Sequence, residues 1–135
     1  MLTHVQNELF DLGANLPVPL DDAGGERPRL CVEPGEVMLL ERACDQANAG
    51  LPSCSASCCP AGPRPPRLHL ARTMCRRAER RAVALGDHAE VNAAALAYLD
   101  RLGDLLFILA RAANAAAGCT EPLWRPDAST DAHAD

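Results

Sequence analysis

The sequence contains no lysine, so all thirteen of its basic residues are arginine. This absence excludes a lysine-dependent phosphate loop, a Schiff-base lysine and a lysine general base. Aromatic residues make up only 3% of the 135 residues. A core that is poor in aromatic and β-branched side chains but rich in alanine and leucine favours packed helices over a sheet. A protein without lysine also suggests a gene of high G+C content.

An excess of positive charge and a long apolar run are missing as well. The net charge of −5 argues against a general nucleic-acid binder. The longest strongly apolar run, 105–110, is too short to cross a bilayer. Residues 1–20 have no basic start and are interrupted by acidic residues, so we expect no signal peptide. We therefore expect a cytoplasmic chain that binds no membrane and no nucleic acid, with its seven cysteines reduced.

Hydrophobic spacing and helix-end signals predict four helices in one domain spanning 1–135. Pro34 suits a first helical turn, Asn92 is a good N-terminal cap, and Gly50, Gly86 and Gly118 suit helix ends. The predicted helices cover residues 2–16, 34–50, 68–85 and 93–117. This pattern indicates an all-α fold, an antiparallel helical bundle followed by a flexible tail over 120–135.

The third predicted helix carries an arginine repeat. Arg72, Arg76 and Arg80 recur every four residues, so their side chains share one face, and Glu79 can orient the guanidinium of Arg76. Guanidiniums stacked in this way repel one another unless an anion or acidic side chains lie opposite. One interpretation is a phosphate site, because arginine donates bidentately to phosphate oxygens. The other is a solvated basic face balanced by nearby acidic residues, namely Asp87, Glu90 and Asp100.

The amino-acid sequence of this region resembles that of a known family. The segment LHLARTMCRRAERR (68–81), followed by VNAAALAYLDRLGDLLFILARAAN (91–114), closely resembles the PduO-type corrinoid adenosyltransferases. VQNELFDLGANL (5–16) and EPGEVMLLERACDQANAGLP (33–52) resemble the two helices that come before, and the likeness covers nearly all of 2–124. It implies transfer of the 5′-deoxyadenosyl group of ATP to cob(I)alamin or cob(I)yrinic acid diamide, forming adenosylcobalamin and releasing triphosphate. It also implies Mg²⁺ with the ATP and a homotrimer.

The resemblance assigns roles to individual residues. Those it places at the ATP site are Arg76, Arg77, Glu79, Arg80 and Asp100. Arg72 is expected to support a contact between subunits, and Asp104 to form a structural ion pair. No catalytic residue and no metal ligand is assigned, because cobalt(I) is itself the nucleophile and the protein has to align it and neutralise the departing triphosphate.

Two departures from the family concern the nucleotide. The sequence lacks the family's Thr-Gly-Asp-x-Gly segment for ATP and the first helix that follows it. Asp100 stands where the family has an asparagine that contacts the nucleotide. An aspartate cannot donate as an amide does, and its charge repels a triphosphate.

A third departure is the segment SCSASCCPAGPRPPR (53–67), where the family has Phe-Val-Leu-Pro-Gly-Gly with its phenylalanine beneath the corrin. In G+C-rich codons, reading that motif one base later gives Ser-Cys-Cys-Pro-Ala-Gly, which is 57–62. We therefore expect 54–66 to be a frame-shifted reading. The alternatives are an ordinary divergent loop and a metal site, although the cysteines match no common zinc spacing. The cysteines concerned are Cys54, Cys58 and Cys59.

These departures lead to a further expectation, that the chain as written has little or no adenosyltransferase activity. They also leave an alternative function open. In that alternative the chain is a non-catalytic helical bundle that binds nucleotides or acidic partners through the face formed by Arg72, Arg76 and Arg80.

Overall fold

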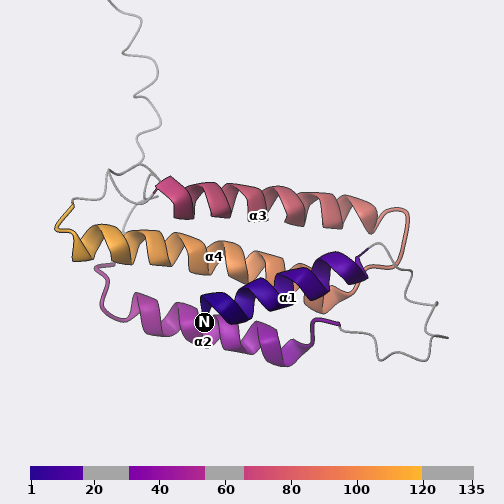
Figure 1. Cartoon of the computed structure of the whole chain (residues 1–135), viewed down its shortest axis with the longest axis horizontal. Helices are drawn as coiled ribbons and strands as arrows, with labels where there is room; N and C mark the ends of the chain where they lie inside the picture. Colours follow the sequence, from indigo (N-terminus) through magenta and orange to yellow (C-terminus); the bar gives the residue numbers. More distant parts are fainter. Residues whose placement is uncertain (17–30, 54–65, 120–135) are drawn as a thin grey trace, which may run out of the picture.

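The structure, a computed structural model, describes residues 1–16, 31–53 and 66–119. Within these ranges every regular element is an α-helix (Figure 1). The helices are α1 (Leu2–Asn15), α2 (Pro34–Asn48), α3 (Pro66–Leu85) and α4 (Ala93–Ala116). The all-α prediction is confirmed, and the helix boundaries agree with the predicted ones to within two residues.

Consecutive helices alternate in direction, and α4 lies between α2 and α3 (Figure 1). The antiparallel pair α3 and α4 is fixed by contacts such as that between Arg76 and Asp100. The neighbours α2 and α4 instead run parallel. The side chain of Asn92 donates to the carbonyl of Val32 at one end, and Arg111 donates to the carbonyl of Pro52 at the other. The bundle is thus antiparallel in chain order, with one parallel pair of neighbours.

The core is centred on α4, which is buried on more than one side because it contacts both α2 and α3. Tyr98, Leu99 and Leu105 are its largest fully buried side chains. The spacing of apolar residues in the sequence predicts a stripe along α4 formed by Leu96, Leu99, Leu102, Leu106, Leu109 and Ala113. This stripe includes Leu99 but misses Tyr98 and Leu105. A single stripe describes a helix with one neighbour, whereas the central helix of a bundle buries a wider arc.

The helix ends follow the signals in the sequence. The side-chain oxygen of Asn92 accepts from the N–H of Ala94 at 2.9 Å, as an N-terminal cap does. Gly118 follows α4 with φ of +66°, a left-handed conformation that glycine adopts without steric cost. Pro34 is the first residue of α2, and the Glu36 carboxylate accepts from the N–H of Glu33. These local interactions explain why the boundaries were predictable.

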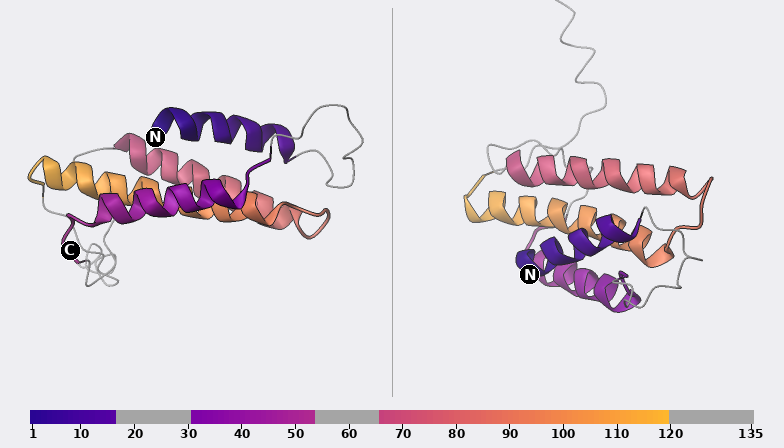
Figure 2. Two further views of the ribbon diagram at one scale, coloured as in Figure 1. Left: turned by 90° about the horizontal axis from the view of Figure 1, so that it is seen from below. Right: turned by 45° about the vertical axis from the view of Figure 1, so that its right-hand side comes forward.

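Helix α1 crosses the bundle beside α2 and α4 (Figure 2). Val5 and Leu12 are buried, while Leu2 and Phe10 on the same helix are exposed. A buried polar contact adds to this packing, because the hydroxyl of Tyr98 donates to the carboxylate of Glu8. Burial and this hydrogen bond raise the pKa of Tyr98, so the phenol stays protonated.

Several expectations fall on segments outside the described ranges. The cysteine- and proline-rich stretch 54–65 and the tail 120–135 are among them, as are residues 17–30. In the part of the chain that is described, none of the helices has a stretch long and apolar enough to cross a membrane.

Candidate anion site between helices α3 and α4

Arg76 is the centre of the candidate site. It projects from the middle of α3 toward α4, and its Nη1 lies 2.9 Å from Glu79 Oε2 on the same helix. The same nitrogen lies 3.3 Å from Asp100 Oδ1 on α4. The predicted pairing of Arg76 with Glu79 is confirmed. Of the three acidic residues named in the alternative of a solvated basic face, Asp100 pairs with Arg76, whereas neither Asp87 nor Glu90 pairs with an arginine among the described residues.

Gly103 gives the arginine side chain its path across α4. A Cβ placed on this buried glycine would lie 3.3 Å from Cδ of Arg76. The aliphatic part of Arg76 therefore lies directly over the glycine, one turn from Asp100. Glycine in a helix interior costs about 0.5–1 kcal/mol relative to alanine. The close approach of the Arg76 side chain explains why a glycine stands at this position despite that cost.

Arg101 connects the site to α2. Its guanidinium lies 2.8 Å from Asp104 and 3.4 Å from Glu41, and a longer contact of 3.8 Å reaches Asp100. Asp104 thus pairs with Arg101, while the structural role expected for it stays a prediction. All of these groups are between 40 and 55% exposed, so solvent screens them and each pair contributes little to stability.

The other two arginines of the repeat differ from Arg76. The guanidinium carbon of Arg72 lies 5.1 Å from the ring centroid of Phe107, a cation–π contact between α3 and α4. Burial and the nearby charge of Arg72 lower the pKa of His69, so that histidine is neutral at pH 7. Arg80, one turn beyond Arg76, is exposed and forms no ion pair within the described part of the chain.

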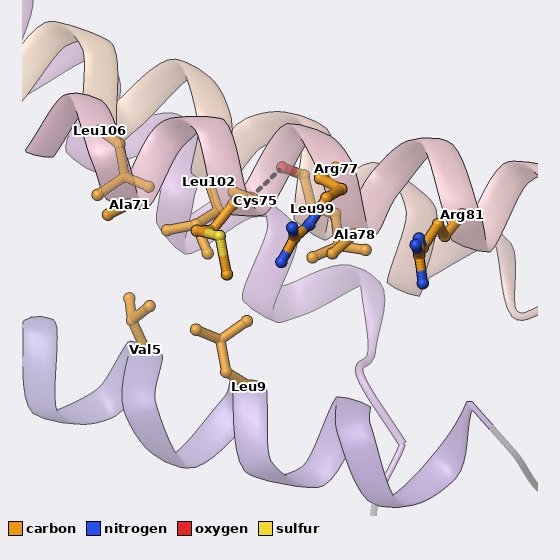
Figure 3. A pocket seen from close by; sticks show the side chains of 11 residues that line it. Val5, Leu9, Ala71, Cys75, Arg77, Ala78, Arg81, Leu99, Leu102 and Leu106 are labelled. Atoms are coloured by element: carbon orange, nitrogen blue, oxygen red, sulfur yellow. Dashed lines mark hydrogen bonds between the residues drawn. The ribbon is translucent and has the colours of Figure 1, made fainter.

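Arg77 is not brought together with Arg76. It extends from α3 toward the side where α1 lies, and Arg81 does the same one turn later (Figure 3). The five residues expected at the ATP site therefore separate into two groups. Arg76 contacts both Glu79 and Asp100, and Arg80 lies one turn further along α3, while Arg77 faces another part of the molecule.

Two cysteines lie close to the site, and both are protonated at neutral pH. Cys75 is buried, and its thiol donates to the carbonyl of Leu99 at 3.1 Å. Burial, followed by the charge of Glu79, raises the pKa of Cys75 to about 11. Burial and then Asp104 raise the pKa of Cys44. Thiols of this kind are poor nucleophiles, which agrees with a packing role for Cys75.

The arrangement can bind an anion better than it can bind a metal. Arg76 offers bidentate donors held in place by carboxylates, and Arg80 adds a second guanidinium one turn away. Among the described residues there is no group of three or more histidine, cysteine, aspartate or glutamate side chains that could hold a metal ion. Cys54, Cys58 and Cys59 lie outside the described ranges.

Sequence reasoning missed Gly103 and Arg101. Both were signalled by position, because Gly103 lies three residues after Asp100 on one face of α4, and Arg101 lies three residues before its partner Asp104. A glycine inside an otherwise alanine- and leucine-rich helix was a second signal. What the sequence lacked was the register between α3 and α4, which brings this face to Arg76.

Comparison with known proteins identifies one family that the chain matches and several relatives of similar sequence. The family described as cobalamin adenosyltransferase matches residues 1–113. The cobalamin adenosyltransferase of Cupriavidus metallidurans is 40% identical over 125 residues, which are 92% of this chain and 64% of the relative. The corrinoid adenosyltransferase of Mycobacterium tuberculosis is 44% identical over 129 residues, 93% of this chain and 65% of the relative. The chain thus spans somewhat less than two thirds of the length of these relatives.

Solved structures give the same result for the fold. A PduO-type ATP:corrinoid adenosyltransferase from Lactobacillus reuteri, a phenylalanine-to-histidine variant complexed with cobalamin and ATP, superposes with a TM-score of 0.83 at 32% identity. The match covers 93% of this chain and 67% of that one. A phenylalanine-to-alanine variant of the same protein, also complexed with cobalamin and ATP, has a TM-score of 0.80 at 33% identity, with 92% and 68% covered.

Proposed function

This chain belongs to the cobalamin adenosyltransferase family, and from that premise we propose that it acts as an ATP:corrinoid adenosyltransferase. The reaction transfers the 5′-deoxyadenosyl group of ATP to the cobalt of cob(I)alamin or cob(I)yrinic acid diamide. Adenosylcobalamin forms and triphosphate is released. ATP and the corrinoid are the two substrates in this proposal, as the relatives complexed with cobalamin and ATP suggest.

One observation carries the proposal, the position of the Arg76 guanidinium. It is held by Glu79 on its own helix and by Asp100 on α4, and its side chain rests on Gly103. A guanidinium held in this way is preorganised, so little entropy is lost when it meets a phosphate. Together with Arg80 it forms a place where the negative charge of a triphosphate can be neutralised.

The chemistry fits residues of this kind. The electron pair of cobalt(I) forms the bond to C5′, and the C5′–O bond breaks with its electron pair leaving on triphosphate. The protein need not provide a nucleophile. Its part is to align C5′ with cobalt and to stabilise the charge that develops on the leaving group. Arg76 and Arg80 are the groups we assign to the leaving triphosphate.

Magnesium belongs to the proposal as a counter-ion of the ATP phosphates. Mg²⁺ commonly binds through substrate phosphates and water, with one or two protein carboxylates. The described residues offer no larger ligand group, so we assign the ion to the nucleotide. The proposal also includes a homotrimer in the cytoplasm, with Arg72 supporting the contact between subunits.

A second candidate function is nucleotide or acidic-partner binding without chemistry through the face of Arg72, Arg76 and Arg80. The observation that favours it is that Glu79 and Asp100 already neutralise much of the charge of Arg76, which leaves less positive charge to stabilise a leaving triphosphate than reversible binding requires. Under this alternative, ATP protects the fold against unfolding but no adenosylcobalamin forms.

The test is to add ATP to the full chain with chemically reduced cobalamin and to follow the corrinoid absorbance. We expect adenosylcobalamin to form only slowly with the chain as written, because Asp100 competes with the triphosphate for Arg76. We expect Arg76→Ala to weaken ATP binding by about 1.5–3 kcal/mol, the scale for a hydrogen bond to a charged group. Arg67→Ala, an exposed arginine of the same helix, is the control. ATP binding without turnover would support the second function. Normal ATP binding by the Arg76 variant would contradict both.

A further inference from the structure

His69 lies in the first turn of α3, at the end of the helix where Arg72 contacts Phe107 of α4. Both nitrogens of its ring are shielded from solvent, and neither has a hydrogen-bond partner in the described part of the chain. Nε of Arg72 is shielded and unpartnered in the same way. Buried polar groups in native proteins are normally hydrogen-bonded, so an imidazole without a partner calls for a physical explanation.

The charged residues that surround His69 on its own helix are basic. Arg72 follows His69 by three residues, so the two side chains lie on one face of α3. Arg67 comes two residues before His69 and is exposed. Residues 66–73 contain no aspartate or glutamate. This end of α3 therefore offers the imidazole a neighbouring guanidinium but no carboxylate.

The facing turns of α4, the helix that packs against α3, also lack an acidic residue. Because α3 and α4 are antiparallel neighbours (Figure 1), the turn before Arg72 lies opposite the turn after Phe107. Residues 107–114 contain no aspartate or glutamate, and their one charged side chain, Arg111, donates to the carbonyl of Pro52. A positively charged imidazole would thus find no carboxylate in these turns of either helix.

Protonation of His69 in its buried position is unfavourable. Burial, followed by the positive charge of Arg72, lowers the pKa of His69 from its ordinary value of 6.5. A protonated ring would also bury two N–H donors that have no acceptor, whereas a neutral ring buries one. The ring can take up a proton readily only if it first reaches water.

We propose that His69 is an acid-sensitive switch, and that its protonation releases the first turns of α3 from α4 and separates Arg72 from the ring of Phe107. Release at this place requires little free energy, because the first four N–H groups of a helix have no partner within it and helix ends open more easily than a core. The imidazolium then gains hydration, and the two positive charges move apart.

The direction of the pH dependence follows from the lowered pKa of His69. Above pH 6.5 the ring is neutral in both the packed and the released helix, so this residue contributes no pH dependence. Below pH 6.5 the released ring binds a proton and the buried ring resists it, so release becomes more favourable as pH falls. At pH 5.5 the charged form of an exposed histidine outweighs the neutral form about tenfold, and the released population should rise by about that factor.

Amide hydrogen exchange of the full chain, followed by mass spectrometry and corrected for intrinsic rates, measures the release. We expect the protection of residues 70–76 to fall about tenfold from pH 7.5 to pH 5.5, with smaller changes in α2. His69→Leu keeps an apolar side chain at this position but removes the titrating group, so its protection should be similar at both pH values. His88→Leu alters an exposed histidine just beyond the other end of α3 and should respond to acid as the unaltered chain does.

An NMR titration of the His69 ring tests the physical cause of the switch. Its midpoint should lie below pH 6.5, and Arg72→Gln should raise it, because the neighbouring charge is removed. A midpoint of 6.5 or higher in the unaltered chain, equal protection at both pH values, or an acid response that persists in His69→Leu would each overturn the proposal. All of these measurements are made without ATP or a corrinoid, so their outcome does not depend on the activity proposed above.

Discussion

Single residues decide how much charge the candidate site can offer to a ligand. Arg76 is positioned by three separate features, namely the open space over Gly103 and the carboxylates of Glu79 and Asp100. The same carboxylates that orient the guanidinium also neutralise it. Orientation and charge are therefore opposed at this site, and the residue that changes the balance most directly is Asp100.

Replacing Asp100 with asparagine should strengthen anion binding at Arg76. The amide has nearly the same size and can donate a hydrogen bond, but it carries no charge to compete with a phosphate. The Arg76–Asp100 pair is about 40% exposed, so screening limits the gain to about 0.5–1 kcal/mol, or a two- to fivefold increase in affinity. Calorimetric titration with tripolyphosphate measures this change.

Two controls make the Asp100 prediction specific. Asp45→Asn removes the same charge from an exposed position on α2 and should leave the affinity unchanged. The gain from Asp100→Asn should shrink at high salt, because the effect is electrostatic. Equal affinities for Asp100→Asn and the unaltered chain would show that Asp100 does not compete with the ligand.

Cys75 should make the stability of the fold depend on alkaline pH. Its pKa is raised to about 11 from the ordinary value of 9.0. Between these values the unfolded thiol ionises while the folded one stays protonated, so stability is full below pH 9 and falls as pH rises toward 11. Ionisation of this thiol in the unfolded state should lower the free energy of unfolding by about 2–3 kcal/mol between pH 9 and pH 11.

The readout for Cys75 is the free energy of unfolding by urea at pH 8 and at pH 10.5, with Cys75→Ala for comparison. The variant loses the hydrogen bond to Leu99 and should be less stable at pH 8. Its deficit should become smaller at pH 10.5, because Tyr98 and Cys44 titrate in both proteins whereas Cys75 titrates only in one. A deficit that is constant with pH would contradict the raised pKa.

At the scale of elements, the sequence predicts the helices well because their signals are local. Asn92, Pro34 and Gly118 act through contacts within a few residues, and each lies at the beginning or the end of a helix. The positions of the helices relative to one another are less predictable. Tyr98 and Leu105 fall outside the expected stripe and are nevertheless fully buried, since α4 contacts helices on more than one side.

Helix α1 is the element whose attachment relies most on a single polar contact. Tyr98→Phe removes the hydroxyl that donates to the buried carboxylate of Glu8. An unpaired buried polar group costs about 1–3 kcal/mol. We expect this loss to appear as faster amide hydrogen exchange in α1, with smaller changes in α2, α3 and α4. Hydrogen exchange followed by mass spectrometry resolves the helices.

His4→Ala is the matched control for Tyr98→Phe. His4 Nε2 lies 2.8 Å from the other oxygen of Glu8. Its side chain is 58% exposed, so its loss should change exchange in α1 only slightly. Equal acceleration in all four helices after Tyr98→Phe would mean that α1 opens only when the whole bundle unfolds.

At the scale of the whole molecule, the candidate site depends on register between helices. The sequence predicts that Arg72, Arg76 and Arg80 share a face of α3, and it predicts the pairing of Arg76 with Glu79. It does not predict that α4 presents Gly103 to Arg76, or that Arg77 turns toward α1. The positions of Gly103 and Arg77 depend on packing between helices that are far apart in the chain, and local sequence patterns do not encode such packing.

Assembly is the last property at this scale. Several large apolar side chains are exposed on the chain, among them Met38, Leu39, Leu70 and Val83. Subunits that cover such surface gain free energy. The exposed surface favours assembly, and the resemblance to the adenosyltransferase family implies three subunits. We therefore predict a homotrimer at micromolar concentration, with a mass three times that of the 14.3 kDa chain. Sedimentation velocity measures it, and a clean monomer would contradict the prediction.

Arg72→Ala tests the residue assigned to the subunit contact. We expect this variant to sediment at a lower mass than the unaltered chain, while its helix content stays the same because alanine is a good helix former.

Arg72 also contacts the ring of Phe107 within the chain, so Phe107→Leu is needed to separate the two roles. It removes the cation–π contact, worth about 0.5–1 kcal/mol, but keeps the arginine, and it should remain trimeric. Arg67→Ala, at an exposed position on the same helix, should also remain trimeric. If Phe107→Leu dissociates as readily as Arg72→Ala, the arginine acts by packing α3 against α4 and not through a partner subunit.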